Sequence, residues 1–202
     1  MPRSVLDLRR RYLEKKQFAK WRRSGCPIPP PHVVKQYAIA EYQKTYGCQI
    51  LVETGTYRGD MVEAQKKRFK KIISIELGVD LFEKAQERFR NDANVVIVQG
   101  DSGRVLPEIV REIHEPAVFW LDGHYSGGIT AKGNKESPIF EELDAIFSTK
   151  NSNHILLIDD ARCFTGEGSY PTIGQLIEYI RSKNETYEVE VKHDIIRCVG
   201  RG

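Results

Sequence analysis

Short apolar runs alternate with longer amphipathic stretches over most of this chain. The spacing predicts strands at 49–54, 71–76, 94–100, 117–122 and 154–160. It predicts helices after them at 59–69, 78–92, 102–113, 137–148 and 172–182. The strand runs are continuous and rich in β-branched residues, which is typical of strands buried on both faces. This order predicts a Rossmann-like, doubly wound α/β fold, with a mostly parallel sheet and helices on both faces.

The C-terminal end departs from this alternation. Residues 187–191 and 195–200 are two strand patterns separated only by a short polar link. No helix fits between them, so they are expected to pair as an antiparallel hairpin.

The N-terminal end also departs from it. Residues 4–23 predict a helix, which the proline-rich run 25–32 interrupts before a second helix at 33–46. We therefore expect two regions: a basic helical arm with its connector at 1–32, and one globular domain at 33–202.

Composition narrows the class of protein. The 202 residues are 40% hydrophobic and 29% charged, which is ordinary for a soluble chain. No apolar run reaches the roughly 20 residues of a membrane-spanning helix, and no signal-peptide pattern is present. The four cysteines form no CxxC pair. We therefore expect reduced thiols, no structural zinc and a cytoplasmic location.

Charge is unevenly distributed. Residues 1–24 carry nine basic and two acidic side chains, a net charge of +7, so the rest of the chain carries −4. An acidic body does not suit nucleic acid, which is not an expected partner. By default, the arm packs its apolar stripe (Val5, Leu8 and Tyr12) on the body. The alternatives are contact with an anionic membrane, anchored by Phe18 and Trp21, or with phosphate in RNA or a nucleotide-sugar.

Acidic residues stand at the ends of all five predicted parallel strands: Glu53, Glu76, Asp101, Asp122 and the pair Asp159 and Asp160. In an open parallel sheet, ligands bind beyond these ends. Each acid also has a simple structural explanation, such as a helix cap for Asp101. Together they would place repelling charges at one edge, which is costly unless something binds there.

Three segments resemble the cofactor-binding segments of class I S-adenosylmethionine-dependent methyltransferases: "LVETGTYRGDM" (51–61), "IISIE" (72–76) and "VIVQGDSGRVLPEI" (96–109). The hairpin is similar to the last strand pair of that family, so the resemblance covers 47–200. It implies S-adenosylmethionine as the cofactor. It implies that the methionine part faces Glu53, Gly55 and Gly59. It implies that the ribose faces Glu76 and the adenine Asp101 and Ser102.

The E-x-G-x-x-x-G turn is similar to that of metal-dependent O-methyltransferases of the catechol and caffeoyl-CoA type. This likeness implies Mg²⁺ held by Asp122, Asp159 and Asp160, with Asp160 standing where that group has Asn. Such oxygen ligands suit Mg²⁺, which would orient an acceptor hydroxyl and lower its pKa. Asp122 could also position a hydroxyl without a metal.

The catalytic base departs from that pattern. The catechol-type enzymes have a lysine where this chain has Tyr125, so His124 is the candidate base. The segment "LDGH" (121–124) more loosely resembles bacterial methyltransferases of glycan and natural-product pathways. Two glycine-rich loops, 125–136 and 161–172, are expected to bind the acceptor or to act as lids.

The expected function is methyl transfer to a hydroxyl of a small molecule or sugar. The sequence leaves the oligomeric state open and is compatible with a dimer. Two alternatives stay open: an RNA methyltransferase that uses the basic arm, and a non-catalytic binding module. An NAD-dependent dehydrogenase is less favoured, because the first turn lacks G-x-G-x-x-G.

Overall fold

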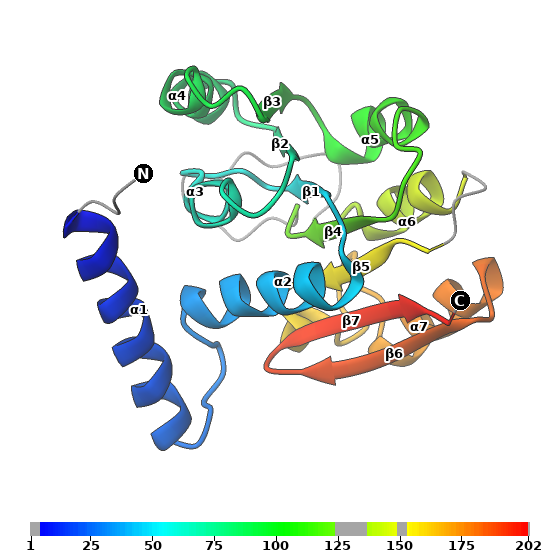
Figure 1. Cartoon of the computed structure of the whole chain (residues 1–202). Coiled ribbons are helices and arrows are strands. Elements are labelled where there is room, and N and C mark those ends of the chain that lie inside the picture. The colour runs from blue at the N-terminus through cyan, green and yellow to red at the C-terminus, as the bar shows by residue number, and fades with distance from the viewer. Residues whose placement is uncertain (1–4, 124–136, 149–152, 202) are drawn as a thin grey trace.

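A single mixed sheet forms the centre of the molecule (Figure 1). The computed structural model describes residues 5–123, 137–148 and 153–201. The strands are β1 (Ile50–Thr54), β2 (Lys71–Glu76), β3 (Val95–Gln99), β4 (Ala117–Leu121), β5 (Ile155–Ile158), β6 (Tyr187–Lys192) and β7 (Ile195–Gly200). Their order in the sheet is β3-β2-β1-β4-β5-β7-β6. β1 to β5 run parallel, whereas β7 is antiparallel to β5 and β6, which confirms the predicted sheet and hairpin.

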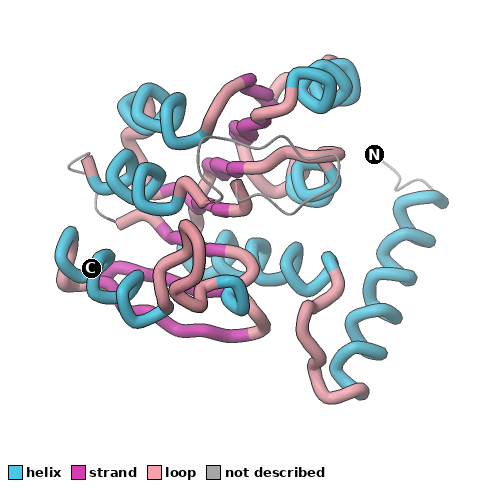
Figure 2. Tube along the Cα trace, turned by 180° about the vertical axis from the view of Figure 1, so that it is seen from behind, coloured by secondary structure: helices cyan, strands magenta, loops and turns pink. Residues whose placement is uncertain are grey.

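Helices cover both faces of the sheet, as Figures 1 and 2 show from opposite sides. They are α1 (Val5–Arg23), α2 (His32–Tyr46), α3 (Asp60–Gln65), α4 (Val79–Phe89), α5 (Ser102–Arg111), α6 (Ile139–Phe147) and α7 (Ile173–Lys183), with a 3₁₀ turn η1 (Ala161–Cys163). Two separate hydrophobic clusters lie between the layers. One joins the sheet to α2, α3 and α4, and the other joins it to α5, α6 and α7. The doubly wound architecture is confirmed.

The strand β4 shows why the sheet lies at the centre. Val118 and Trp120 enter the cluster beneath α2, whereas Phe119 and Leu121 enter the opposite cluster. Successive side chains of a strand point to opposite faces, so an uninterrupted apolar run serves both cores. Burying each large side chain of this kind contributes about 1.5–3 kcal/mol.

The arm helix α1 lies beside this body and touches it mainly at its C-terminal end (Figure 1). Trp21 is 4% exposed and packs with Val33 and Val34 of α2. Its Nε1 donates a hydrogen bond to the Pro27 carbonyl at 2.8 Å. Trp21, one of the two anchors in the alternative of membrane contact, thus has its ring buried in the protein.

Three other apolar side chains of α1 are largely exposed. Leu8, Tyr12 and Leu13 are 53%, 65% and 53% exposed. The expected packing of the stripe is therefore wrong at Leu8 and Tyr12, although Arg10 Nη1 lies 3.6 Å from Glu63 Oε1 of α3. Among the described helices, none is long and apolar enough to cross a membrane.

Two local details differ in instructive ways. α6 begins at Ile139, two residues later than the predicted start at 137, with Pro138 as its N-cap and Ser137 buried before it. The hairpin link is tighter than expected, because only His193 and Asp194 separate β6 from β7. Both have positive φ, 56° and 64°, as a two-residue hairpin turn of matching twist requires.

Candidate functional site at the carboxyl edge of the sheet

Backbone hydrogen bonds align the ends of the parallel strands. The N–H of Asp122 donates to the Thr54 carbonyl at 3.1 Å, and the N–H of Asp159 donates to the Leu121 carbonyl at 3.0 Å. The N–H of Gly100 likewise donates to the Glu76 carbonyl at 2.9 Å. The ladder thus extends one residue past each strand. It brings the predicted acidic series to one edge: Glu53, Glu76, Asp101, Asp122, Asp159 and Asp160.

The glycines of the first turn are required by packing. Gly55 has φ 93°, and a Cβ there would lie 2.5 Å from the carbonyl oxygen of Asp122. Gly59 has φ 74°, and its Cβ would lie 2.5 Å from the Phe89 ring. Both positions therefore need glycine for the protein's own close contacts. Their predicted contact with the methionine part of the cofactor stays a prediction.

Glu53 is buried within β1 rather than exposed at its end. Its side chain accepts a hydrogen bond of 2.5 Å from Ser74 Oγ, and Ser74 Oγ lies 2.6 Å from Thr56 Oγ1. Burial raises the pKa of Glu53 from 4.5 to about 8, although the Ser74 hydrogen bond opposes this rise. The side chain is therefore mainly a neutral carboxylic acid near pH 7.

Glu76 ends β2 and is held by the backbone on both sides. Its Oε2 accepts from the N–H of Tyr57 at 2.7 Å, and its Oε1 accepts from the N–H of Gly78 at 2.9 Å. Each carboxylate oxygen can accept more than one hydrogen bond. The carboxylate is thus fixed beside the glycine turn, with acceptor capacity for a ligand's hydroxyl groups.

Asp101 and Ser102 lie at the start of α5. Asp101 is the N-cap, and its Oδ1 accepts from the N–H of Gly103 at 3.0 Å. The hydroxyl of Ser102 donates to Glu142 Oε1 of α6 at 2.6 Å. Gly123 is packed against this pair, since a Cβ there would lie 2.8 Å from Glu142 Oε1. Glu142 is a buried acid of the site that the sequence did not predict. A glutamate in the first turn of a helix is usually exposed, so the pattern of α6 does not indicate that this one is buried.

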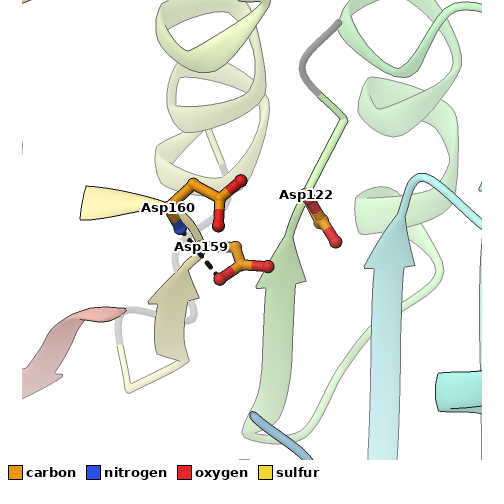
Figure 3. Close-up of side chains that lie close together, drawn as sticks. All are labelled: Asp122, Asp159 and Asp160. Atoms are coloured by element: carbon orange, nitrogen blue, oxygen red, sulfur yellow. Dashed lines mark hydrogen bonds between the residues drawn. The ribbon is translucent and has the colours of Figure 1, made fainter. Parts of the chain in front are cut away.

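Asp122, Asp159 and Asp160 converge as predicted. Asp122 follows β4, and the other two follow β5, and the three side chains lie close together (Figure 3). One ligand oxygen from each lies within 4.8 Å of the others. The backbone N–H of Asp160 also donates to Asp159 Oδ1 at 2.8 Å. Three acidic groups from two strands therefore share one small volume.

A lysine that the sequence reasoning missed lies among them. The Nζ of Lys35, on α2, is 2.5 Å from Asp159 Oδ2 and 3.1 Å from Asp160 Oδ1. The side chains of Lys35, Asp159 and Asp160 are only 16%, 0% and 13% exposed. Lys35 is one of many charged residues on the predicted helices, and its sequence position does not distinguish it. Only the packing of α2 on the sheet shows this contact.

Burial and the closeness of these charged side chains shift their pKa values. Burial raises the pKa of Asp122 well above its usual range, and the neighbouring Asp159 raises it further. Burial also raises the pKa of Asp159, against the opposing effect of Lys35. Burial alone would lower the pKa of Lys35, but Asp159, Asp160 and Asp122 together raise it above its ordinary value. The ammonium therefore stays charged.

A second cation closes the other side of the cluster. Arg162 Nη1 lies 2.7 Å from Asp160 Oδ1 and also contacts Asp194 Oδ2. The backbone N–H of Arg162 donates to Asp194 Oδ1 at 2.9 Å. Asp194 belongs to the β6–β7 turn, so the hairpin is tied directly to the acidic cluster.

The two predicted acceptor loops have different outcomes. His124, Tyr125 and the loop 125–136 lie outside the described residues, so the predicted base and the first loop stay predictions. The second loop, 161–172, is anchored. Phe164 is 5% exposed, and Thr165 forms a β-bridge with Thr172. Such a packed loop favours a fixed wall over a moving lid.

Comparison with known proteins agrees with this geometry. No protein-family model matches the sequence. The O-methyltransferase TomG from Streptomyces achromogenes, solved with S-adenosylmethionine, superposes with a TM-score of 0.57 at 15% identity, over 94% of this chain and 89% of that one. An O-methyltransferase from Bacillus cereus, solved with S-adenosylhomocysteine, gives 0.57 at 12% identity, over 100% and 93%.

One sequence relative also matches a short segment. The ribosomal RNA small subunit methyltransferase A of Caldanaerobacter subterraneus subsp. tengcongensis is 38% identical over 63 residues. These are 31% of this chain, and they span 24% of that protein's length. Taken with the strand order and the terminal antiparallel strand, the structural matches show that this chain has the fold of the S-adenosylmethionine-dependent methyltransferases.

Proposed function

We propose that the protein is an S-adenosylmethionine-dependent methyltransferase that acts on an oxygen of a small molecule or sugar. The observation that carries the proposal is one sheet edge with two sites. One is a fixed carboxylate, Glu76, beside a glycine turn, and the other is the carboxylate cluster of Asp122, Asp159 and Asp160, two to three strands away. Ligands of open parallel sheets bind at such an edge.

Each half of the edge has its own role in the proposal. The turn at Gly55 and Gly59, Glu76, and the pair Asp101 and Ser102 would hold the methionine part, the ribose and the adenine of the cofactor, respectively. The acceptor hydroxyl lies at the carboxylate cluster. Because transfer is a single displacement, alignment of the two is most of the catalysis.

Asp122 is the group best suited to receive the proton of the acceptor. S-adenosylmethionine supplies a methyl group whose bond to sulfur breaks as its bond to the acceptor oxygen forms, leaving S-adenosylhomocysteine. The hydroxyl proton passes to Asp122. Its raised pKa supports this role, because a carboxylate with a raised pKa is a stronger base. His124 is the alternative base.

Mg²⁺ fits the donor atoms but not their surroundings. Three carboxylates are ligands that Mg²⁺ prefers, and they could orient the hydroxyl through it. However, Lys35 already contacts Asp159 and Asp160, and Arg162 contacts Asp160. A divalent ion would have to displace the lysine, so the proposed transfer is assigned no metal step.

RNA is the second candidate acceptor. The segment shared with a ribosomal RNA methyltransferase and the exposed basic helix α1 favour it. Binding through α1 would weaken steeply as salt rises, since it would release counterions from phosphate. A small acceptor predicts turnover that is nearly independent of salt, so a salt series separates the two.

Calorimetric titration tests the proposal itself. We expect S-adenosylmethionine and S-adenosylhomocysteine each to bind with one site per chain. Absence of heat from both at millimolar concentration would overturn the proposal. Binding of the cofactor without any methyl transfer to a panel of hydroxyl compounds and RNA would favour the non-catalytic binding module instead.

A further inference from the structure

Lys35 occupies the position that a metal ion would need. Its Nζ contacts one carboxylate oxygen of Asp159 and one of Asp160, and its charge also acts on Asp122. A metal held by the three carboxylates would have to lie in the same small volume that the ammonium contacts. The ammonium and a divalent ion therefore compete for one place.

The lysine is held there by the fold. The residues next to it, Val33 and Val34, are 2% exposed and pack against Trp21. Farther along α2, Ala38 and Ile39 are buried against the sheet. The backbone of α2 is thus fixed on both sides of Lys35, and the side chain is directed at the carboxyl edge without a flexible loop.

Two cations already lie at these carboxylates. Lys35 contacts Asp159 and Asp160, and Arg162 contacts Asp160 and Asp194. A divalent ion added beside the ammonium of Lys35 would place two cations next to each other in a largely buried site, and their repulsion is costly.

We propose that Lys35 is the resident cation of this site, so that its ammonium holds Asp159 and Asp160 in the place where related folds would hold a divalent metal ion. Lys35 is then a positioning residue: it fixes the two carboxylates that face the acceptor. This role rests on the proposed methyl transfer, but the occupancy of the site by lysine does not.

Manganese titration tests the occupancy directly. Mn²⁺ is added to the full-length protein, and free Mn²⁺ is followed by its electron paramagnetic resonance signal. We expect the wild type to bind Mn²⁺ weakly. Lys35→Met, which removes the charge and keeps the length of the side chain, should bind at least roughly tenfold tighter. Adding Asp159→Asn to Lys35→Met should abolish the gain.

Two controls keep the result specific. Lys44→Met removes an exposed lysine from the same helix and should behave as the wild type. Lys35→Arg keeps the charge and should also exclude Mn²⁺. The proposal is overturned if the wild type binds Mn²⁺ as tightly as Lys35→Met, or if tight binding by the wild type is lost in Asp159→Asn. That second comparison decides the question even if Lys35→Met does not fold.

The test is separable from the proposed function. Cofactor titration of the same proteins reports on methyl transfer, whereas Mn²⁺ titration reports only on the cation in the carboxylate cluster. Failure to bind S-adenosylmethionine would remove the chemical role of Lys35 and leave its occupancy standing. Tight Mn²⁺ binding by the wild type that depends on Asp159 would overturn the occupancy by Lys35 and leave the proposed methyl transfer standing.

Discussion

The backbone of Gly55 lies so close to the Asp122 carbonyl that a Cβ at Gly55 would stand 2.5 Å from its oxygen. The turns after β1 and β4 therefore touch directly. The cofactor half and the acceptor half of the proposed site are thus built as one rigid unit.

Gly55→Ala is expected to destabilise the protein by about 2 kcal/mol or more, because it adds a steric clash to a strained φ of 93°. Chemical denaturation measures the free energy of unfolding. Gly25→Ala is the matched control, since Gly25 has φ 83° with nothing within 4 Å of its Cβ. Equal losses in the two variants would show that the contact with Asp122 is unimportant.

Glu76→Gln is expected to weaken S-adenosylmethionine binding by about 1.5–3 kcal/mol, the usual contribution of hydrogen bonds to a charged group. The amide also turns donors toward Tyr57 N–H or Gly78 N–H, where the carboxylate accepts. Calorimetry gives the affinity. Glu83→Gln, on the exposed side of α4, should leave it unchanged. Unchanged affinity in Glu76→Gln would remove Glu76 from the cofactor site.

Glu53 is expected to make the folded protein less stable as pH rises. Its pKa is raised from 4.5 to about 8, so the folded state binds a proton more tightly than the unfolded state does. Stability contributed by this proton is present below the unfolded pKa and is lost as pH rises toward the folded one. Glu53→Gln mimics the neutral acid and should therefore flatten this loss.

Urea denaturation near pH 5 and about pH 9 measures the difference. We expect the wild type to lose more stability than Glu53→Gln over this interval. Asp122 and Asp159, whose pKa values are also raised by burial, keep some of the slope in the variant. Identical slopes would show that Glu53 is ionised in the folded protein.

Trp21→Ala is expected to free the arm helix. Trp21 is the buried contact of α1 with Val33 and Val34, so its loss removes that anchor. Trypsin should then cut within 5–23 much faster, whereas the body remains folded. Tyr12→Ala, on the same helix but 65% exposed, should be cut at the wild-type rate. Equal rates for the two variants would contradict the anchoring role.

Local patterns were enough to predict the sheet edge. An acid stood at or near the end of each predicted parallel strand, and parallel strands bring such ends together. Asp122, Asp159 and Asp160 could therefore be predicted as one cluster before their geometry was known. The hairpin was predictable for a similar reason, because two strand patterns stood without a helix between them.

The partners of those acids could not be predicted. Lys35 lies 124 positions from Asp159 in sequence, and the tie between Arg162 and Asp194 spans the loop after β5 and the terminal turn. Such contacts depend on how α2 and the hairpin cross the sheet, which no local pattern encodes. The exposure of Leu8 and Tyr12 on α1 was likewise not predictable, since an apolar stripe does not say how a helix lies on its neighbours.

Val34 and Lys35 are neighbours on α2, and this has a practical consequence. Val34 packs on Trp21 of α1, and the very next residue neutralises Asp159. A chain shortened to begin at residue 33 would lose the partner of this helix end and loosen the ammonium from the carboxylates. We therefore expect a displacement of α1 to reach Lys35 through Val34 and to change the charge at the carboxylate cluster.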